Sequence, residues 1–275
     1  MRSLLRFFSL TFAFTWICWA ASRAISYGST PVLLLGVFAP GLVALALTER
    51  YEGRAATRAL IARIFKWDVG ARWYAFAILY IPAIKLVVAL VHRIVTDAWP
   101  RFGQEPVYAM AAALLVSTWI QAGEEVGWRG YALPRLSERF GLAQASVILG
   151  GIWATWHLPI FFFPVGDLLG QSFPLYLLQV TAISVTMAWL YWRTGGSLLI
   201  VMLFHAAVNN LKDIVPSATP GATNPFVFNA SLVGWLTVAF LWIAAAYFLF
   251  KMRGVTALPS AVVGTGDREP FRIQD

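Results

Sequence analysis

The sequence predicts an all-α fold, a polytopic membrane helix bundle of about eight transmembrane helices with its active site inside the bundle. Hydrophobic residues make up 59% of the 275 residues and charged residues only 12%, whereas about a quarter of the residues in a soluble domain are charged. The apolar residues also fall in long runs separated by polar, Pro- or Gly-containing breaks. Each run approaches the roughly 20 residues that a helix needs to cross the hydrocarbon. These observations exclude a single water-soluble core.

Taken in chain order, the apolar runs give the expected spans. They extend approximately over Leu4 to Ala21, Val32 to Leu47, Trp73 to Val95, Val107 to the pair Glu124 and Glu125, Ala143 to Phe163, Pro174 to Trp192, Leu198 to Leu211, and Ser231 to Phe250. We expect the short second and seventh runs to be buried by neighbours, tilted or only partly spanning. The runs define a single membrane domain over residues 1–253 with its motif-bearing core at about 107–211. Residues 254–275 are expected to form a disordered cytosolic tail.

The net charge of +8 is explained by membrane topology, and we expect no nucleic-acid partner because the basic residues form no single patch. If the N-terminus is cytosolic, the basic residues on the far side are Arg23, Arg93, Arg101 and Lys212. Those on the cytosolic side are Arg2, Arg6, Arg50, Arg54, Arg58, Arg63, Lys66, Arg72, Arg135, Arg139, Arg193, Lys251 and Arg253. This positive-inside pattern predicts a multi-pass protein of the cell (inner) membrane with both termini cytosolic and the segment 124–141 on that side.

Two further segments carry charge near or within apolar sequence. The segment from Glu49 to Arg72 interleaves apolar and basic residues, which favours an interfacial helix on the headgroups over a site for a partner helix. Lys85 lies inside the third run. We expect it to face the bundle or to reach an interface, with a structural role.

The adjacent carboxylates Glu124 and Glu125 are the most informative feature, because charges at bilayer depth are costly and indicate function. Residues four apart share a helix face, so Glu125 and Arg129 can pair. Adjacent residues diverge by about 100°, which leaves Glu124 free of the arginine. One carboxylate can then stay ionised as a support while its neighbour acts as an acid or base.

Two of the three histidines lie in other apolar runs. His157 follows a Trp-Ala-Thr-Trp segment that begins at Trp153, and His205 precedes Asn209 by one helical turn. His92, at the end of a span, is interpreted as interfacial. In a chain with so few intramembrane polar groups, His157, His205 and Asn209 are candidate site residues.

These residues carry a resemblance to a known family. The segment from Glu124 to Tyr131, Glu-Glu-Val-Gly-Trp-Arg-Gly-Tyr, resembles the Glu-Glu-x-x-x-Arg motif of the CPBP family, which comprises CAAX proteases and bacteriocin-processing enzymes and is also called the ABI family. Trp153 to His157 is similar to its second motif, an aromatic residue four before a histidine, with Trp where Phe is commoner. His205 to Asn209 is similar to its third, His-x-x-x-Asn.

The resemblance implies an intramembrane endopeptidase, similar to the type II CAAX prenyl endopeptidase that removes the last three residues of prenylated proteins. It implies that Glu124 activates water with help from His157, that Glu125 and Arg129 orient the site, and that His205 and Asn209 stabilise the oxyanion. Its partners would be the lipid bilayer and a peptide or lipidated protein substrate.

Metal dependence stays open at the level of sequence. Glu124, His157 and His205 would supply a His, His, carboxylate set for a divalent ion such as zinc. The chain has no His-Glu-x-x-His motif, and a water mechanism with His and Asn donors needs no ion. We therefore prefer a mechanism without an obligatory metal.

Two other classes of function use the same polar cluster. A transporter or channel would use the glutamates and histidines as an ion path, and internal repeats would support it; none is visible in the sequence. A non-catalytic membrane immunity protein would not be expected to keep all three motifs.

Overall fold

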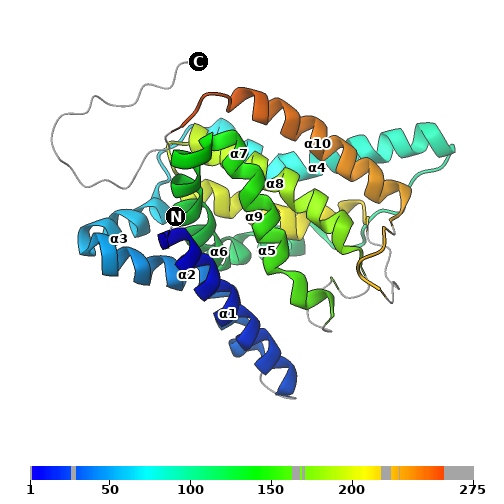
Figure 1. Cartoon of the computed structure of the whole chain (residues 1–275). Coiled ribbons are helices and arrows are strands. Elements are labelled where there is room, and N and C mark those ends of the chain that lie inside the picture. The colour runs from blue at the N-terminus through cyan, green and yellow to red at the C-terminus, as the bar shows by residue number, and fades with distance from the viewer. Residues whose placement is uncertain are drawn as a thin grey trace.

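The computed structural model describes residues 2–25, 29–162, 168, 171–217, 224–228 and 230–256, and its regular structure there is entirely helical (Figure 1). The helices are α1 (Arg2–Ala24), α2 (Ser29–Glu52), α3 (Arg54–Ala62), α4 (Ala71–Thr96), α5 (Val107–Ile120), α6 (Ala122–Glu125), α7 (Leu133–Trp156), α8 (Phe173–Arg193), α9 (Leu198–Leu211) and α10 (Leu232–Lys251). Three short 3₁₀ segments, η1 (Arg63–Phe65), η3 (Leu158–Phe161) and η4 (Lys212–Ile214), and a π-helical segment, η2 (Val126–Ala132), connect them. The all-α prediction is confirmed.

Each predicted span corresponds to a helix, and among the described residues five helices are long and apolar enough to cross a membrane: α1, α2, α4, α8 and α10. The seventh span is short as expected, because α9 has 14 residues. The second span is longer than expected, since α2 has 24 residues, with Pro40 inside it. Hydropathy marks where a helix leaves lipid, and α2 continues beyond that point into polar sequence.

The fifth span starts close to its predicted position, because Gly141 breaks α7 just before the predicted start at Ala143, but it ends earlier than predicted. Helix α7 begins at Leu133 and ends at Trp156, with a kink at Gly141 (φ 73°). His157 therefore follows the helix instead of lying within it. The predicted end of this span at Phe163, and most of the predicted tail, lie outside the described residues.

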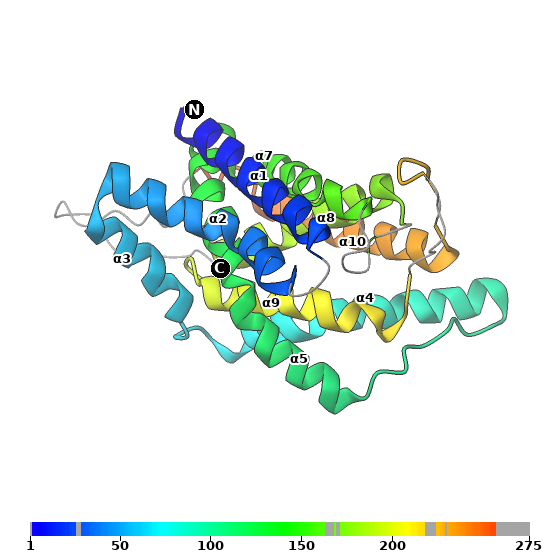
Figure 2. The ribbon, with the colours of Figure 1, turned by 90° about the horizontal axis from the view of Figure 1, so that it is seen from below.

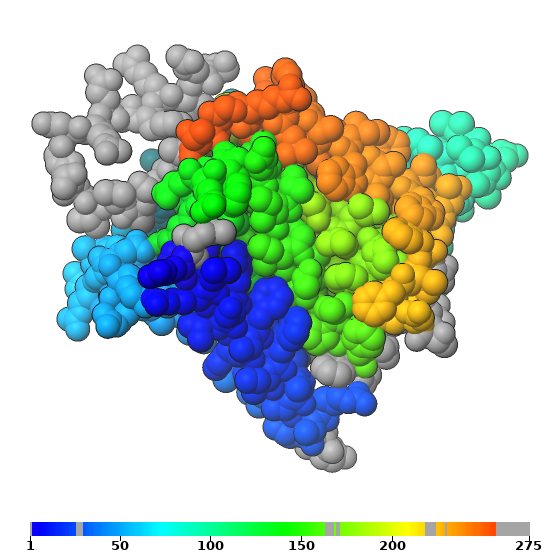
Figure 3. Space-filling model, viewed as in Figure 1, coloured from blue at the N-terminus to red at the C-terminus, as the bar shows by residue number. Residues whose placement is uncertain are grey.

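The three elements that carry the motifs lie among the other helices. Figure 2 shows α9 alongside α4 and α5, and α9 also packs against α6 and α8. Helix α7 packs along α8, and Figure 3 shows α7 in green, with α1 in blue and α10 in orange on either side of it. Of the motif residues, the two glutamates, Arg129 and His205 are buried in the bundle, whereas His157 is half-buried and Asn209 is exposed.

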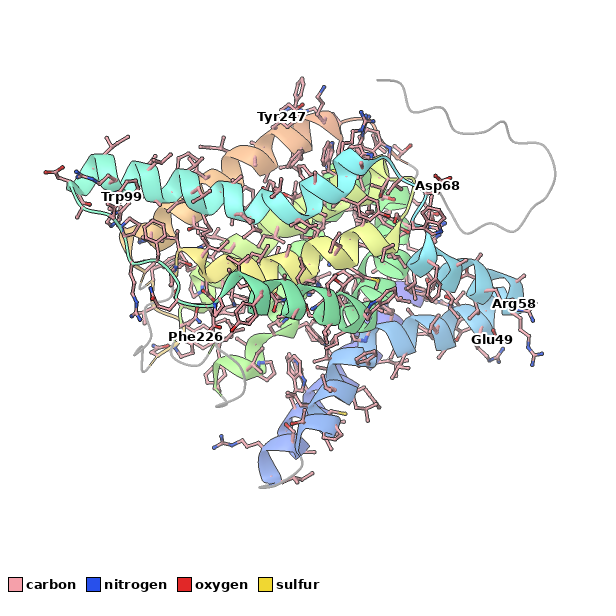
Figure 4. All side chains as sticks on the ribbon, turned by 180° about the vertical axis from the view of Figure 1, so that it is seen from behind. Glu49, Arg58, Asp68, Trp99, Phe226 and Tyr247 are labelled. Atoms are coloured by element: carbon pink, nitrogen blue, oxygen red, sulfur yellow. The ribbon has the colours of Figure 1, made fainter. Side chains whose placement is uncertain are left out.

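The two ends of the bundle differ in their chemistry. Figure 4 shows Glu49, Arg58 and Asp68 at one end and Trp99 and Phe226 at the other. At the first end, which we call the basic end, Lys66 Nζ donates to the Gly195 carbonyl at 2.8 Å. Burial there, with the nearby Arg63 charge, lowers the pKa of Lys66, and Asp68 partly opposes this. Several basic residues of the predicted cytosolic group thus lie at one end.

The amphipathic segment forms α3 and η1 at the basic end. Leu60 is buried against the bundle, whereas Phe65 and Trp67 are 60% and 73% exposed. Arg63 Nη1 donates to Tyr191 Oη at 2.6 Å. The segment thus has one side anchored to the bundle and an outward apolar side that suits an interface with headgroups.

Candidate active site

The glutamate pair stands where the backbone of α2 comes very close. A Cβ at Gly127 would lie 2.6 Å from Pro40 atoms, and one at Gly123 would lie 2.9 Å from the Phe38 ring. Such distances exclude any side chain at the two glycines, so this approach requires glycine. After Glu125 the chain continues as the π-helical η2, a geometry that is frequent at functional sites.

Glu125 forms a buried ion pair and a second contact with a histidine. Arg129 Nη1 donates to Glu125 Oε1 at 2.9 Å and to Oε2 at 3.1 Å, and both side chains are 0% exposed. His205 Nδ1 lies 2.8 Å from the same Oε1. Because an ionised carboxylate only accepts hydrogen bonds, Nδ1 carries the proton. The i, i+4 pairing expected from the sequence is present, and tertiary packing adds His205 to it.

Glu124 points elsewhere and is held by two indoles. Trp153 Nε1 donates to Glu124 Oε2 at 2.7 Å, and Trp128 Nε1 lies 3.4 Å from the same oxygen. The Arg129 guanidinium stacks over the Trp153 ring at 4.3 Å, a favourable cation–π distance. Glu124 and Glu125 therefore diverge as predicted, and their neighbourhoods differ in charge.

Sequence reasoning missed the role of Trp153 as a hydrogen-bond donor. The second motif identified the position as aromatic, and its Trp in place of the commoner Phe was counted as a mild change. A buried Trp usually finds a partner for its N–H, and that rule is the signal that could have indicated the contact. The departure from the family pattern supplies a hydrogen bond that Phe cannot make.

His157 lies at the C-terminal end of α7 with its ring among aromatic residues. Its Nδ1 lies 2.9 Å from the Trp153 carbonyl oxygen, so Nδ1 carries the proton and Nε2 is the acceptor nitrogen of the neutral ring. The rings of Trp156 and Tyr176 meet it edge to face, with centroids at 4.6 Å and 5.5 Å.

A cavity of ≈150 Å³ joins these side chains. Glu124, His157, His205 and Asn209 all line it, together with Trp153. Glu125 and Arg129 do not line it and lie behind His205. Lys85, which the sequence identified only as an intramembrane charge, is also part of the wall.

The positions of the candidate metal ligands bear on the question of metal dependence. Among the described residues, no three His, Cys, Asp or Glu side chains come close enough together to hold an ion. Within the proposed set, Glu124 Oε2 accepts from indole N–H groups, and His205 Nδ1 contacts Glu125, a contact that metal-ligating histidines also make with the nitrogen that does not bind the ion. Metal dependence therefore stays a prediction, and no step of the mechanism below passes through a metal.

The fold and the site define a multi-pass membrane protein that encloses a glutamate- and histidine-lined cavity. Residues 103–211, which contain all three motifs, match the family model of type II CAAX prenyl endopeptidase Rce1-like proteins. The chain is also similar to the CAAX prenyl protease 2 of Methanococcus maripaludis, with 24% identity over 230 residues that cover 76% of this chain and 83% of that protein. The resemblance to CAAX proteases is thus confirmed over the motif-bearing residues. These two matches support the activity of an intramembrane endopeptidase.

Proposed function

We propose that this protein hydrolyses a peptide bond of a membrane-associated substrate with water activated by Glu124. The observation that carries the proposal is the division of labour between the two glutamates. Glu124 lines the cavity with His157, His205 and Asn209, whereas Glu125 lies behind it, paired with Arg129. Among the described residues Glu124 forms no ion pair, and a carboxylate that is not paired with a cation can accept a proton, which is what a general base requires.

In the first step, a water molecule between Glu124 and His157 attacks the carbonyl carbon of the scissile bond. The water gives one proton to Glu124, and the His157 Nε2 acceptor orients its other hydrogen. The N–H of Trp153, 2.7 Å from Oε2, fixes the carboxylate. When the tetrahedral intermediate collapses, the C–N bond breaks and Glu124 passes its proton to the leaving amine, which restores the base.

The negative oxygen of the intermediate needs donors aimed at it. The Nδ1–H of His205 is directed to Glu125 at 2.8 Å, which leaves its Nε2–H as the donor to the oxyanion when the ring is protonated. The carboxylate of Glu125 stabilises that imidazolium. Asn209, one turn further along α9, supplies the second donor from its amide. Glu125 and Arg129 are therefore positioning residues.

Replacement of single residues tests these roles. Glu124→Gln should lower turnover by about 10²- to 10⁴-fold, the usual contribution of a general base, while Glu138→Gln, an exposed glutamate on α7, serves as the control. His205→Ala and Asn209→Ala should each lower kcat by about 10²- to 10³-fold with a smaller effect on KM. Peptidase activity that survives Glu124→Gln at more than a tenth of its original level would contradict the mechanism.

We propose that turnover requires no metal. Elemental analysis of the purified protein, with activity measured before and after chelation, tests this. One tightly bound zinc per chain whose removal and return track activity would overturn the metal-free mechanism and leave the protease assignment intact.

The substrate class we propose is a prenylated C-terminal peptide, after the activity named for the similar archaeal protein. Mass spectrometry of peptides that accumulate in cells carrying Glu124→Gln, compared with the parent, identifies the substrate. Accumulation of unprenylated peptides, such as bacteriocin precursors, would instead assign the protein to peptide maturation.

We also propose that the basic end and both termini face the cytosol. In a Cys18→Ala background, a cysteine at the exposed Arg58 should react only with a reagent supplied from inside. One at the exposed Asp97, at the other end of the bundle, should react from outside. The reverse pattern of labelling would overturn this orientation.

A further inference from the structure

Lys85 of α4 is a buried cation in the wall of the same cavity as Glu124. It is 3% exposed, so the expectation that it faces the bundle is confirmed. Its Nζ donates to Ser217 Oγ at 3.2 Å and to Thr237 Oγ1 at 3.4 Å. These partners come from the segment after α9 and from α10, so three parts of the chain converge on the ammonium.

The charge of Lys85 is poorly compensated by the protein. Among the described residues, no carboxylate lies within ion-pair distance of it, and both of its hydrogen-bond partners are neutral hydroxyls. Asp213 and Lys212, which carry opposite charges, also line the cavity. Burying a charge without a counter-charge is costly, and an anion entering the cavity would relieve that cost.

The size and composition of the cavity indicate which anion enters. A volume of ≈150 Å³ is about that of a cavity that holds one benzene ring, so it suits the end of a peptide better than a chain that passes through. The anion present in every unmodified peptide end is the C-terminal carboxylate. The ammonium and the Ser217 hydroxyl can supply charge-assisted hydrogen bonds that a carboxylate accepts, whereas the Thr237 hydroxyl donates to the Val233 carbonyl at 2.7 Å and so serves to hold the ammonium.

We propose that Lys85, with Ser217, binds the C-terminal carboxylate of the substrate and so selects peptides whose scissile bond lies close to the chain end. Lys85 is then a specificity-determining residue instead of the structural one expected from the sequence. The proposal rests on the proposed function, since Glu124 on the same cavity would act on a bond upstream of the anchored carboxylate.

Binding to the inactive Glu124→Gln protein tests this without any turnover. The probe is a fluorescent peptide with a farnesylated cysteine followed by three residues, made once with a free C-terminal acid and once with a C-terminal amide. In nanodiscs of phosphatidylcholine, the acid should bind about 10- to 100-fold more tightly, the range expected for a charge-assisted hydrogen bond. Adding Lys85→Met should bring the acid-to-amide ratio close to one, and Lys85→Arg should retain part of it.

The experiment also needs a control lysine and a test of whether Lys85 binds a lipid phosphate instead of the peptide. Lys251→Met removes an exposed lysine at the C-terminal end of α10, outside the cavity, and should leave the acid-to-amide ratio unchanged. If Lys85 holds a lipid phosphate instead, the two peptides will bind equally and Lys85→Met will lower the retention of phosphatidylglycerol in native mass spectrometry. That result overturns the proposal.

The two proposals fail separately. Equal binding of acid and amide peptides to the protein that retains Lys85 overturns the carboxylate site, whatever the turnover, and this comparison needs no folded Lys85 variant. Full turnover by Glu124→Gln overturns the proposed mechanism and leaves the measured binding preference in place.

Discussion

Two arginine–glutamate pairs with the same chemistry lie in opposite environments of this protein. Arg129 and Glu125 are 0% exposed inside the bundle, whereas Arg135 and Glu52, at the basic end, have side chains that are 22% and 42% exposed. Water screens the exposed pair, and exposed pairs contribute about 0–1 kcal/mol to the stability of a folded protein. Removing one partner of a buried pair leaves an uncompensated charge and costs about 3–5 kcal/mol. The burial of an ion pair, more than the residue types in it, therefore decides how much stability is lost when the pair is broken.

The difference extends to what each pair does. The Arg135 guanidinium stacks on Tyr131 at 3.6 Å and donates to its carbonyl at 2.8 Å, contacts that tie the start of α7 to η2. Glu125 instead receives donors from both Arg129 and His205. The buried pair thus positions a residue of the cavity, while the exposed pair joins chain segments.

Breaking the buried pair should have the largest effect. We expect Arg129→Met to lower the free energy of unfolding by about 3–5 kcal/mol and to reduce turnover, because Glu125 would remain charged and unpaired. The double variant Arg129→Met/Glu125→Gln should be less destabilised than the single one, since it leaves no buried charge. Steric-trapping measurements of unfolding test both. A double variant as unstable as the sum of the two single variants would show that the residues are not coupled.

The packing that isolates the buried pair can be altered without touching its charges. Gly127→Ala would place a methyl group 2.6 Å from Pro40, and we expect a loss of about 1–3 kcal/mol of stability from overpacking. Gly151→Ala is the control, because a Cβ there meets nothing within 4 Å. Equal thermal stability of the two variants would argue that α2 does not hold the glutamate segment in place.

The hydrogen bond from Trp153 to Glu124, a contact that Glu125 lacks, should affect turnover less than the buried ion pair does. Trp153→Phe keeps an aromatic ring but removes the 2.7 Å hydrogen bond, and we expect kcat to fall about tenfold, as for the loss of one bond to a charged group. Trp128→Phe should have a smaller effect, because its bond is longer at 3.4 Å. Steady-state kinetics of both variants decide the order, and a larger effect of Trp128→Phe would contradict it.

Breaking the exposed pair should have the smallest effect. Arg135→Met should cost less than about 1 kcal/mol of its ion-pair energy, and that loss should shrink further as salt is raised, since exposed charges are screened. Unfolding measured at low and high ionic strength tests this. A salt-independent loss of several kcal/mol would remove the contrast between the two pairs.

The sequence by itself determined the helices and the local relations along them. Hydropathy located each span, and helical periodicity predicted both the pairing of Glu125 with Arg129 and the divergence of Glu124 from its neighbour. These features depend on residues within one or two turns, where 3.6-residue geometry fixes which side chains meet. The ends of α2 and α7 were misplaced because helix ends follow hydrogen bonding and packing as well as hydropathy.

Only the tertiary structure decided which distant side chains share the cavity. His205 reaches Glu125 across 80 positions of sequence, and Trp153 reaches Glu124 across 29; no periodicity relates them. Lys85 was visible as an intramembrane charge, but its position in the wall beside Glu124 depends on how α4 packs against α9 and α10. Contacts between elements arise from the packing of whole helices, and for that reason local sequence patterns identified the chemical groups but not their arrangement around one cavity.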